Sequence, residues 1–321
     1  MEAFITSLQS VAEIIIVIAL GYWLKVSGKV GDEFKGNISF IIMNIALPAS
    51  IFASVLKYLS RDKLAGLTGG LVYAFASFAA SYLLAWILAK VLKIRKGRRG
   101  TFINMFANAN TIFIGLPLNI ALFGQKSLPY FLVYYVVNTI STWAIGVFFI
   151  SADDPTVAKG TKKEFNWKKL LPAPLVGFLV SLVFLLLAIP VPGWITNTLN
   201  MVGGIVTPMS LIYIGIILAD AGLSSIRFDR DTIWALLGRF VFVPAIMIMF
   251  ILIGAKMGAN LPSVEQSTLV IQAGTPGLAV LPILVGQSHG DVRYATNVVT
   301  TSTVLFVIVV PILMQVINMV F

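Results

Sequence analysis

The sequence predicts an all-α protein that crosses a lipid bilayer many times, and three observations lead to that fold class. Hydrophobic residues make up 58% of the 321-residue chain and charged residues only 11%, whereas soluble domains average roughly 25% charged residues. The apolar residues gather in runs long enough to cross the hydrocarbon core, which takes roughly 20 residues per helix. Two of these runs also carry clustered polar residues, Gly and Pro, which lipid tolerates only where protein encloses them.

Ten apolar runs are long enough to span the membrane, and we expect one helix for each. These runs are Ile5–Val26, Gly36–Leu56, Leu64–Leu92, Thr101–Gly124, Leu128–Ser151, Leu170–Ile189, Trp194–Ala221, Thr232–Ala255, Ser263–Ser288 and Val292–Val320. The longest connection, residues 152–169, carries five lysines. It is predicted to be a cytoplasmic linker between a first half, residues 1–151, and a second half, residues 170–321.

The positions of Lys and Arg predict the orientation. Of the 23 Lys and Arg residues, 17 lie in or beside the connections after runs 1, 3, 5, 7 and 9. Basic loops stay on the cytoplasmic side, so we expect both termini to lie outside the cytoplasm of a plasma or inner membrane. The net charge of +10 then reflects loops beside anionic headgroups of the bilayer, and no nucleic-acid partner is expected. No basic residue precedes the first run, which we therefore expect to be retained as a helix.

The two halves resemble each other in the same order. A Pro-x-Ser motif ends at Ser50 in the second run and at Ser210 in the seventh. A Leu-Pro pair ends at Pro117 in the fourth run and at Pro282 in the ninth. Because five helices per half is an odd number, a duplicated half enters the membrane from the opposite face. Inverted repeats with paired Gly/Pro-interrupted helices are typical of secondary transporters that bind substrate near the membrane midplane.

Candidate site residues come from the two polar runs, residues 104–117 and 272–282. A helix broken by Pro or Gly presents free N–H groups on one side and free C=O groups on the other. If runs 4 and 9 break at the same depth and cross, their polar side chains converge on one pocket that suits an anion. These candidates are Asn108, Asn110, Thr111, Gln272 and Thr275, to which we add Ser50. Interhelical hydrogen bonding with proline kinks is the competing interpretation.

Two charged residues within the runs carry alternatives of their own. Glu13 is either a proton-coupling group or a residue facing a wet crevice, and Arg239 is either an anion contact or a side chain that snorkels to the headgroups. The chain has no cysteine, no His/Cys/carboxylate set with metal spacing and no phosphate-binding loop. We therefore expect no enzyme, no metal site and no cofactor.

The motifs resemble one known family. Residues 110–118, Asn-Thr-Ile-Phe-Ile-Gly-Leu-Pro-Leu, resemble the Pro-Asn-Thr-x-x-x-Gly-x-Pro-Leu run of auxin efflux carriers, which include plant PIN-type exporters and bacterial malonate/malate permease relatives. The resemblance implies a scaffold of helices 1, 2, 6 and 7 and a mobile transport domain of helices 3–5 and 8–10. It further implies that Asn110 contacts substrate and that Pro276 is the second crossover proline. The chain departs from the motif at Ala109, where the family has proline.

The resemblance thus predicts a transporter of a small organic anion, either an auxin-like weak acid or a dicarboxylate such as malate or malonate. An elevator-like or rocking motion would carry it. A sodium-coupled symporter of the bile-acid type is one alternative, with neutral oxygens from Asn108, Thr111, Gln272, Thr275, Asn297 and Thr301 as ion ligands. Proton coupling and uncoupled transport stay open, as do a channel and a membrane sensor. The oligomeric state is also open, with a homodimer among the alternatives.

Overall fold

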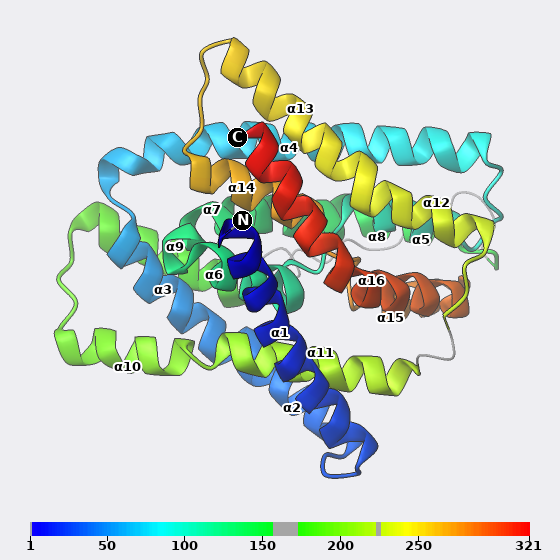
Figure 1. The fold of residues 1–321 in the computed structure, drawn as a ribbon, viewed down its shortest axis with the longest axis horizontal. Helices are drawn as coiled ribbons and strands as arrows, with labels where there is room; N and C mark the ends of the chain where they lie inside the picture. Colours follow the sequence, from blue (N-terminus) through cyan, green and yellow to red (C-terminus); the bar gives the residue numbers. More distant parts are fainter. Residues whose placement is uncertain (1, 157–172, 223–225) are drawn as a thin grey trace.

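The computed structural model describes residues 2–156, 173–222 and 226–321, and these residues are almost entirely helical (Figure 1). The predicted all-α fold class is thereby confirmed. Within the described ranges, the one backbone pairing of β type is an isolated antiparallel bridge between Ala109 and Gly277. Among the described residues, six helices are long and apolar enough to cross a membrane: Asp32–Tyr58, Leu67–Val91, Gln125–Ala152, Gly193–Asp220, Arg230–Lys256 and Val292–Val320.

The helices of the first half follow the predicted runs closely. They are α1 (Glu2–Val26), α2 (Asp32–Ile41), η1 (Ile42–Ala46), α3 (Leu47–Tyr58), α4 (Arg61–Val91), α5 (Arg99–Ala107), η2 (Thr111–Gly115), α6 (Leu116–Phe123), η3 (Gln125–Ser127), α7 (Leu128–Ile140), η4 (Ser141–Gly146) and α8 (Val147–Ala152). Here η1 and η4 are π-helical turns inside longer helices, η2 is the π-helical first turn of the helix that continues as α6, and η3 is a 3₁₀ turn. Such π turns occur frequently at functional sites.

The second half begins after the predicted linker, most of which lies outside the described residues. Its helices are α9 (Ala173–Leu187), α10 (Gly193–Gly203), α11 (Val206–Ala221), α12 (Arg230–Leu237), η7 (Gly238–Phe242), α13 (Val243–Lys256), α14 (Ser263–Ala273), α15 (Leu281–Gly286) and α16 (Val292–Val320). The π turn η7 joins α12 to α13 in one helical segment. The α16 helix has the same bounds as the predicted tenth run.

The helices pack in two groups. In one group, α1 packs along α11, and α3 packs against α9 and α10. In the other, α4 packs against α5, α7 and α13, and α14 packs against α7 and α13. Figure 1 shows α4 and α13 along one edge of the molecule, and α10 and α11 along the opposite edge. Segments η2 and α6 lie between these edges and contact α11.

Candidate functional site

The first interruption of helical structure lies between α5 and η2, at Asn108, Ala109 and Asn110. Asn108 is extended, with φ −101° and ψ 135°, and ends α5. Asn110 begins the next helix, because its side-chain oxygen accepts a hydrogen bond from the Phe113 amide at 3.3 Å. Asparagine side chains compete with the backbone in this way, which disfavours Asn inside helices and favours it at caps.

The second interruption lies between α14 and α15, at residues 274–280. Pro276 has no N–H group to continue a helix. The Gly277 amide instead donates to the side-chain oxygen of Ser302 in α16 at 3.3 Å. Helical structure resumes at Leu281, with Pro282 in the first turn of α15, where the missing N–H costs no intrahelical bond.

The two interruptions lie against each other. Ala109 and Gly277 form the antiparallel bridge, and the Asn110 amide donates to the Pro276 carbonyl at 2.8 Å. Asn138 of α7 holds Ala109 from the other side. Its side-chain oxygen accepts from the Ala109 amide at 2.9 Å, and its side-chain nitrogen donates to the Ala109 carbonyl at 3.0 Å. These hydrogen bonds give partners to buried backbone groups that a continuous helix would otherwise pair.

A cavity of about 280 Å³ opens beside the crossing segments. Its lining residues come from both groups of helices and include no charged side chain: Met43, Ala109, Asn110, Thr111, Ile112, Phe113, Tyr135, Asn138, Thr139, Thr142, Trp143, Leu278, Ala279 and Val280. The first turn of η2 and the residues just before α15 both contribute to this lining. The N-terminal ends of the two helices that follow the interruptions are therefore at the cavity.

Several polar groups at the cavity are available to a ligand. The oxygen of Asn110 is held by the Phe113 amide, and its Nδ2 has no hydrogen-bond partner within the described part of the chain. The Thr142 hydroxyl is buried without a partner. Thr111 accepts a bond of 3.4 Å from Asn138 at its hydroxyl oxygen, which leaves the hydroxyl hydrogen to donate elsewhere.

Asn108 lies behind the cavity lining, in a closed hydrogen-bond network. Its Nδ2 donates to Asn104 at 2.7 Å and to the Tyr82 hydroxyl at 2.8 Å. Its oxygen accepts from the Ser141 hydroxyl at 2.6 Å. These bonds join α4, α5 and η4, so Asn108 contributes to the rigidity of the site.

Arg239 is fully buried and joins the two helices that precede the interruptions. Its guanidinium donates to the Phe106 carbonyl of α5 at 2.8 Å and to the Ala273 carbonyl of α14. The C-terminal end of a helix carries partial negative charge, so the cation neutralises both ends at once. Arg239 does not line the cavity, and its side chain is enclosed by protein.

Three predicted site residues of the second polar run lie beside the crossing without lining the cavity. Gln272 donates to the Gly115 carbonyl of η2 at 2.9 Å, and a side chain on Gly115 would collide with the Gln272 amide. The Thr275 hydroxyl donates to the Ile271 carbonyl at 3.0 Å. Pro276 contributes its carbonyl to the bond from Asn110.

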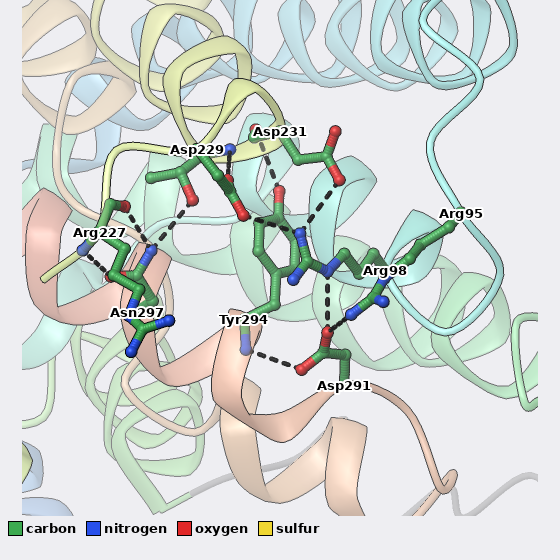
Figure 2. Close-up of polar contacts among 9 residues, drawn as sticks. Arg95, Arg98, Arg227, Asp229, Asp231, Asp291, Tyr294 and Asn297 are labelled. Carbon is green, nitrogen blue, oxygen red and sulfur yellow. Dashed lines mark hydrogen bonds and ion pairs between the residues drawn. The ribbon is translucent and has the colours of Figure 1, made fainter. Parts of the chain in front are cut away.

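The remaining predicted residues lie elsewhere. Ser50 is buried in α3 where α10 approaches closely, since a Cβ on Gly203 would lie 2.7 Å from the Ser50 Cα. Glu13 is exposed on α1. Asn297 binds the backbone of Arg227 through both ends of its amide at 2.8 Å (Figure 2), and Thr301 donates to Asn297. None of these four residues lines the cavity.

A second polar cluster surrounds Arg98, just before α5 (Figure 2). Its guanidinium binds Asp291 and Asp229 at 2.8 Å and Asp231 at 3.2 Å, and it lies over the Tyr294 ring at 4.5 Å. Asp229 and Asp291 also cap α12 and α16 by accepting from the Thr232 and Tyr294 amides. Arg98 thus joins the starts of three helices.

Two aspartates of this cluster, Asp229 and Asp291, are held in their charged form. Burial alone would raise the pKa of Asp291, but hydrogen bonds from Arg98 and from the Tyr294 amide lower it below the ordinary value. The pKa of Asp229 is lowered in the same way against burial, by the Thr232 amide and hydroxyl and by Arg98. Burial disfavours the charge on Arg98, yet the hydrogen bonds to Asp291 and Asp229 raise its pKa overall.

Sequence reasoning missed the α7–η4 side of the cavity, including Asn138, Tyr135, Thr142 and Trp143. The signal was present, because Asn138 and Thr142 lie in an apolar run, where polar residues face the protein interior or a wet cavity. Met43, which brings the other group of helices to the cavity, has no comparable signal. A methionine in an apolar run looks the same whether it faces lipid, core or cavity.

The comparisons with known proteins agree with the membrane-spanning architecture. The profile of the membrane transport protein family matches residues 6–314. An uncharacterized transporter of Methanothermobacter thermautotrophicus is 23% identical over 311 residues, which cover 96% of this chain and 97% of that protein. One from Methanocaldococcus jannaschii is 21% identical over 303 residues, covering 90% and 92%.

A shorter match links the chain to an uncharacterized transporter of Saccharomyces cerevisiae, 23% identical over 115 residues that cover 35% of this chain and 27% of that protein. The family match spans nearly the whole chain and confirms the family resemblance drawn from the motifs. With its membrane-spanning helices, the chain belongs to the membrane transport protein family and is a multi-pass membrane transporter.

Proposed function

We propose that this transporter carries a small organic anion, such as a dicarboxylate or an auxin-like weak acid, and holds it in the cavity beside Asn110. The observation that carries the proposal is that, at the two interruptions, the C-terminal and N-terminal helix ends have different surroundings. Both C-terminal ends are bound by Arg239, and both N-terminal ends lie at the cavity. A cavity of this kind has donors and partial positive charge but no fixed cation.

The N-terminal ends supply the attraction for an anion. Backbone N–H groups in the first turn of a helix are unpaired within it, and the helix dipole adds partial positive charge. The Asn110 Nδ2 and the Thr111 and Thr142 hydroxyls add side-chain donors. Because none of these groups is formally charged, the empty cavity does not contain an unpaired buried charge, which allows the site to cycle between loaded and empty states.

We also propose that the ten predicted runs form two inverted five-helix repeats, with the fourth and ninth helices interrupted. The two interruptions support this arrangement, as do the side-chain bonds at each. Asn138 of α7 holds the Ala109 backbone in the first half, and Ser302 of α16 accepts from the Gly277 amide in the second. A side chain of the fifth run and one of the tenth run thus bind the backbone at corresponding positions of the two interrupted helices.

We propose alternating access by movement between the two groups of helices. In our proposal, α4–α8 and α12–α16 form the transport domain, which carries the cavity and its anion past a scaffold of α1–α3 and α9–α11. The lining residue Met43 lies on the scaffold side of the cavity. We place the protein in the plasma or inner membrane, with the basic connection between α4 and α5 in the cytoplasm.

Equilibrium binding to the purified protein tests the site. We would measure binding of malonate, malate and indole-3-acetate to wild type, Asn110→Ala and Asn119→Ala. Asn119 is a matched control, because it is buried in α6 and binds Ser127 away from the cavity. A hydrogen bond to a charged group contributes about 1.5–3 kcal/mol, so we expect roughly 10- to 100-fold weaker binding in Asn110→Ala.

Asn119→Ala should bind as wild type does. Unchanged affinity in Asn110→Ala would refute the assigned site. Failure of wild type to bind any anion of the panel would refute the substrate class.

A further inference from the structure

Glu265 is a carboxyl group buried without a partner in the part of the molecule assigned to the transport domain. It is the third residue of α14 and is 0% exposed. Neither of its two carboxyl oxygens has a hydrogen-bond partner among the described residues. A buried carboxylate without donors is strongly disfavoured, so such a group is neutralised by a proton or by a bound cation.

The surroundings of the carboxyl favour a proton over a cation. Gly70 of α4 lies directly against it, since a side chain at Gly70 would collide with a Glu265 oxygen, and Val133 of α7 lies beside Gly70. A sodium ion needs several oxygen ligands, and neither Gly70 nor Val133 offers a side-chain oxygen. No group of three or more His, Cys, Asp or Glu residues among the described residues is placed to hold a metal ion.

The titratable and charged groups on neighbouring elements do not pair with Glu265. Tyr130 of α7 is within electrostatic reach, but it makes no hydrogen bond to the carboxyl. The other nearby groups are engaged or turned to solvent. The Tyr73 hydroxyl of α4 donates to the Ala259 carbonyl, and Tyr134 of α7 lies beside Arg239. Lys126 of η3 and Lys256 of α13 are exposed. Arg293 and Tyr294 lie at the start of α16, near the Arg98 cluster, and η2 and α6 contain no titratable or charged residue.

Glu265 begins a row of unpaired buried oxygens along one face of α14. Thr268 and Gln272 follow at i+3 and i+7, which places all three residues on the same side of the helix. Each is 0% exposed, and each has an oxygen without a partner. The row spans about 10 Å at 1.5 Å per residue. It ends where Gln272 donates to Gly115 in η2, one turn from the cavity-lining Thr111.

The Glu265 end of the row lies near an exposed edge of the molecule. Residues 257–260, 262 and 263, in and beside the connection from α13 to α14, are exposed, whereas Leu261 is buried, and Glu265 lies within the first turn of α14. We take this exposed edge to be the aqueous edge from which a proton comes.

We propose that Glu265 is the proton-binding site of the transport domain. A carboxylate oxygen takes a proton from water at the aqueous edge, which neutralises the buried group, and the proton returns to water when the domain moves and rehydrates the carboxyl. The row through Thr268 and Gln272 links this event to the substrate cavity. The coupling of proton and anion movement rests on the proposed transport function, whereas protonation of Glu265 does not.

Infrared spectroscopy of the purified protein at neutral pH tests protonation without a substrate. Wild type should show the C=O stretch of a protonated carboxylic acid, and Glu265→Gln should lose that intensity. Glu13→Gln, which alters an exposed glutamate, should retain it. An unchanged band in a folded Glu265→Gln variant would overturn the proposal.

Carbodiimide labelling of wild type gives the same answer if Glu265→Gln does not fold. The hydrophobic reagent dicyclohexylcarbodiimide adds to protonated carboxyls in apolar surroundings by taking up the acid proton and forming a bond to the carboxyl oxygen. Mass spectrometry should find the adduct on the peptide that contains Glu265. Absence of that adduct, under conditions in which the protein stays folded, would overturn the proposal.

Proteoliposomes test the coupling. With an imposed pH gradient, wild type should take up malonate, malate or indole-3-acetate several-fold faster than without it, and Glu265→Gln should lose that acceleration. If wild type takes up none of these anions, the proposed function fails, while the infrared result still decides protonation. If wild type takes them up and Glu265→Gln retains the full response to the gradient, the coupling role of Glu265 fails.

Discussion

At the scale of single residues, Asn138 does the most to hold the first interruption in place. Its amide pairs with both the N–H and the C=O of Ala109, which is 0% exposed. It also donates to Thr111, a lining residue of the cavity. A proline at position 109 would have no N–H group for the Asn138 oxygen to bind, so this pair of hydrogen bonds requires a residue other than proline there.

We therefore predict that Asn138→Ala lowers both the stability of the protein and its anion affinity. The substitution leaves the buried N–H and C=O of Ala109 without partners, and an unpaired buried group costs about 1–3 kcal/mol. Thermal unfolding in detergent and equilibrium binding of the same anion panel measure the two effects. Asn119→Ala, which removes a buried asparagine outside the cavity, should lower stability without a comparable loss of affinity. Wild-type affinity in Asn138→Ala would contradict the prediction.

The sequence predicted some site residues well and others poorly, for physical reasons that differ. Asn110 was identifiable, because an apolar run accommodates an asparagine mainly where it caps a helix or faces the protein interior. Arg239 was singled out as well, but its contacts were not predictable, because its partners are two backbone carbonyls 133 and 34 residues away along the chain. Glu265 escaped notice because it lies near the predicted start of a membrane span, where a glutamate is ordinarily exposed to water.

At the scale of elements, a basic side chain binds C-terminal helix ends and acidic side chains bind N-terminal helix ends. Arg239 occupies the C-terminal ends of α5 and α14. Asp229 and Asp291 occupy the N-terminal ends of α12 and α16, and both also bind Arg98. These positions agree with the direction of the helix dipole. The N-terminal ends of η2 and α15 lack such a charged residue, and they are the ends that lie at the cavity.

The Arg98 cluster makes the stability of the α5, α12 and α16 starts dependent on pH. The pKa of Asp291 is lower in the folded protein than its ordinary value of about 4. Its stabilising contribution is therefore present above about pH 4 and is lost as the pH falls through the lowered folded value. The pKa of Asp229 is lowered as well and acts in the same direction.

We predict that Arg98→Ala destabilises the protein at pH 7 and has a diminishing effect as the solution is acidified below about pH 4. At pH 7 the loss of the bond to the largely buried Asp291 costs about 2 kcal/mol. Thermal unfolding across a pH series measures it. Arg95→Ala is the matched control, because Arg95 binds the same Asp291 but its side chain is 64% exposed, and exposed pairs contribute little. An equal effect of Arg98→Ala at all pH values would contradict the prediction.

Element boundaries were predictable where the apolar pattern alone determines them. The run Val292–Val320 has the same bounds as α16, and the run Leu64–Leu92 differs from α4 by three residues at its start and one at its end. The run Ser263–Ser288 was harder, because it contains α14, α15 and seven non-helical residues between them. Composition marked an interruption there through Gly and Pro, but its length depends on contacts with residues 109 and 302, which are distant in sequence.

At the scale of the whole molecule, the cavity lies where the two groups of helices meet. The rings of Phe113 in η2 and Tyr213 in α11 are stacked there, with centroids 4.5 Å apart. Phe113 lines the cavity, and Tyr213 belongs to the group that we propose as the scaffold. Movement of one group past the other must separate these two rings, so this contact reports on the proposed motion.

The absence of cysteine from the chain makes the motion directly testable by cross-linking. We predict that Phe113→Cys/Tyr213→Cys, joined by a short disulfide-exchanging reagent in proteoliposomes, loses anion uptake and regains it after reduction. The reason is that the link holds the transport domain against the scaffold. Each single variant, treated with the same reagent, separates the effect of the link from that of modification at the cavity. Phe52→Cys/Phe184→Cys is the matched control, because those rings lie 5.1 Å apart on α3 and α9 within one group, and its uptake should be unaffected. Undiminished uptake by the fully cross-linked Phe113/Tyr213 pair would show that transport does not require the two groups to move apart.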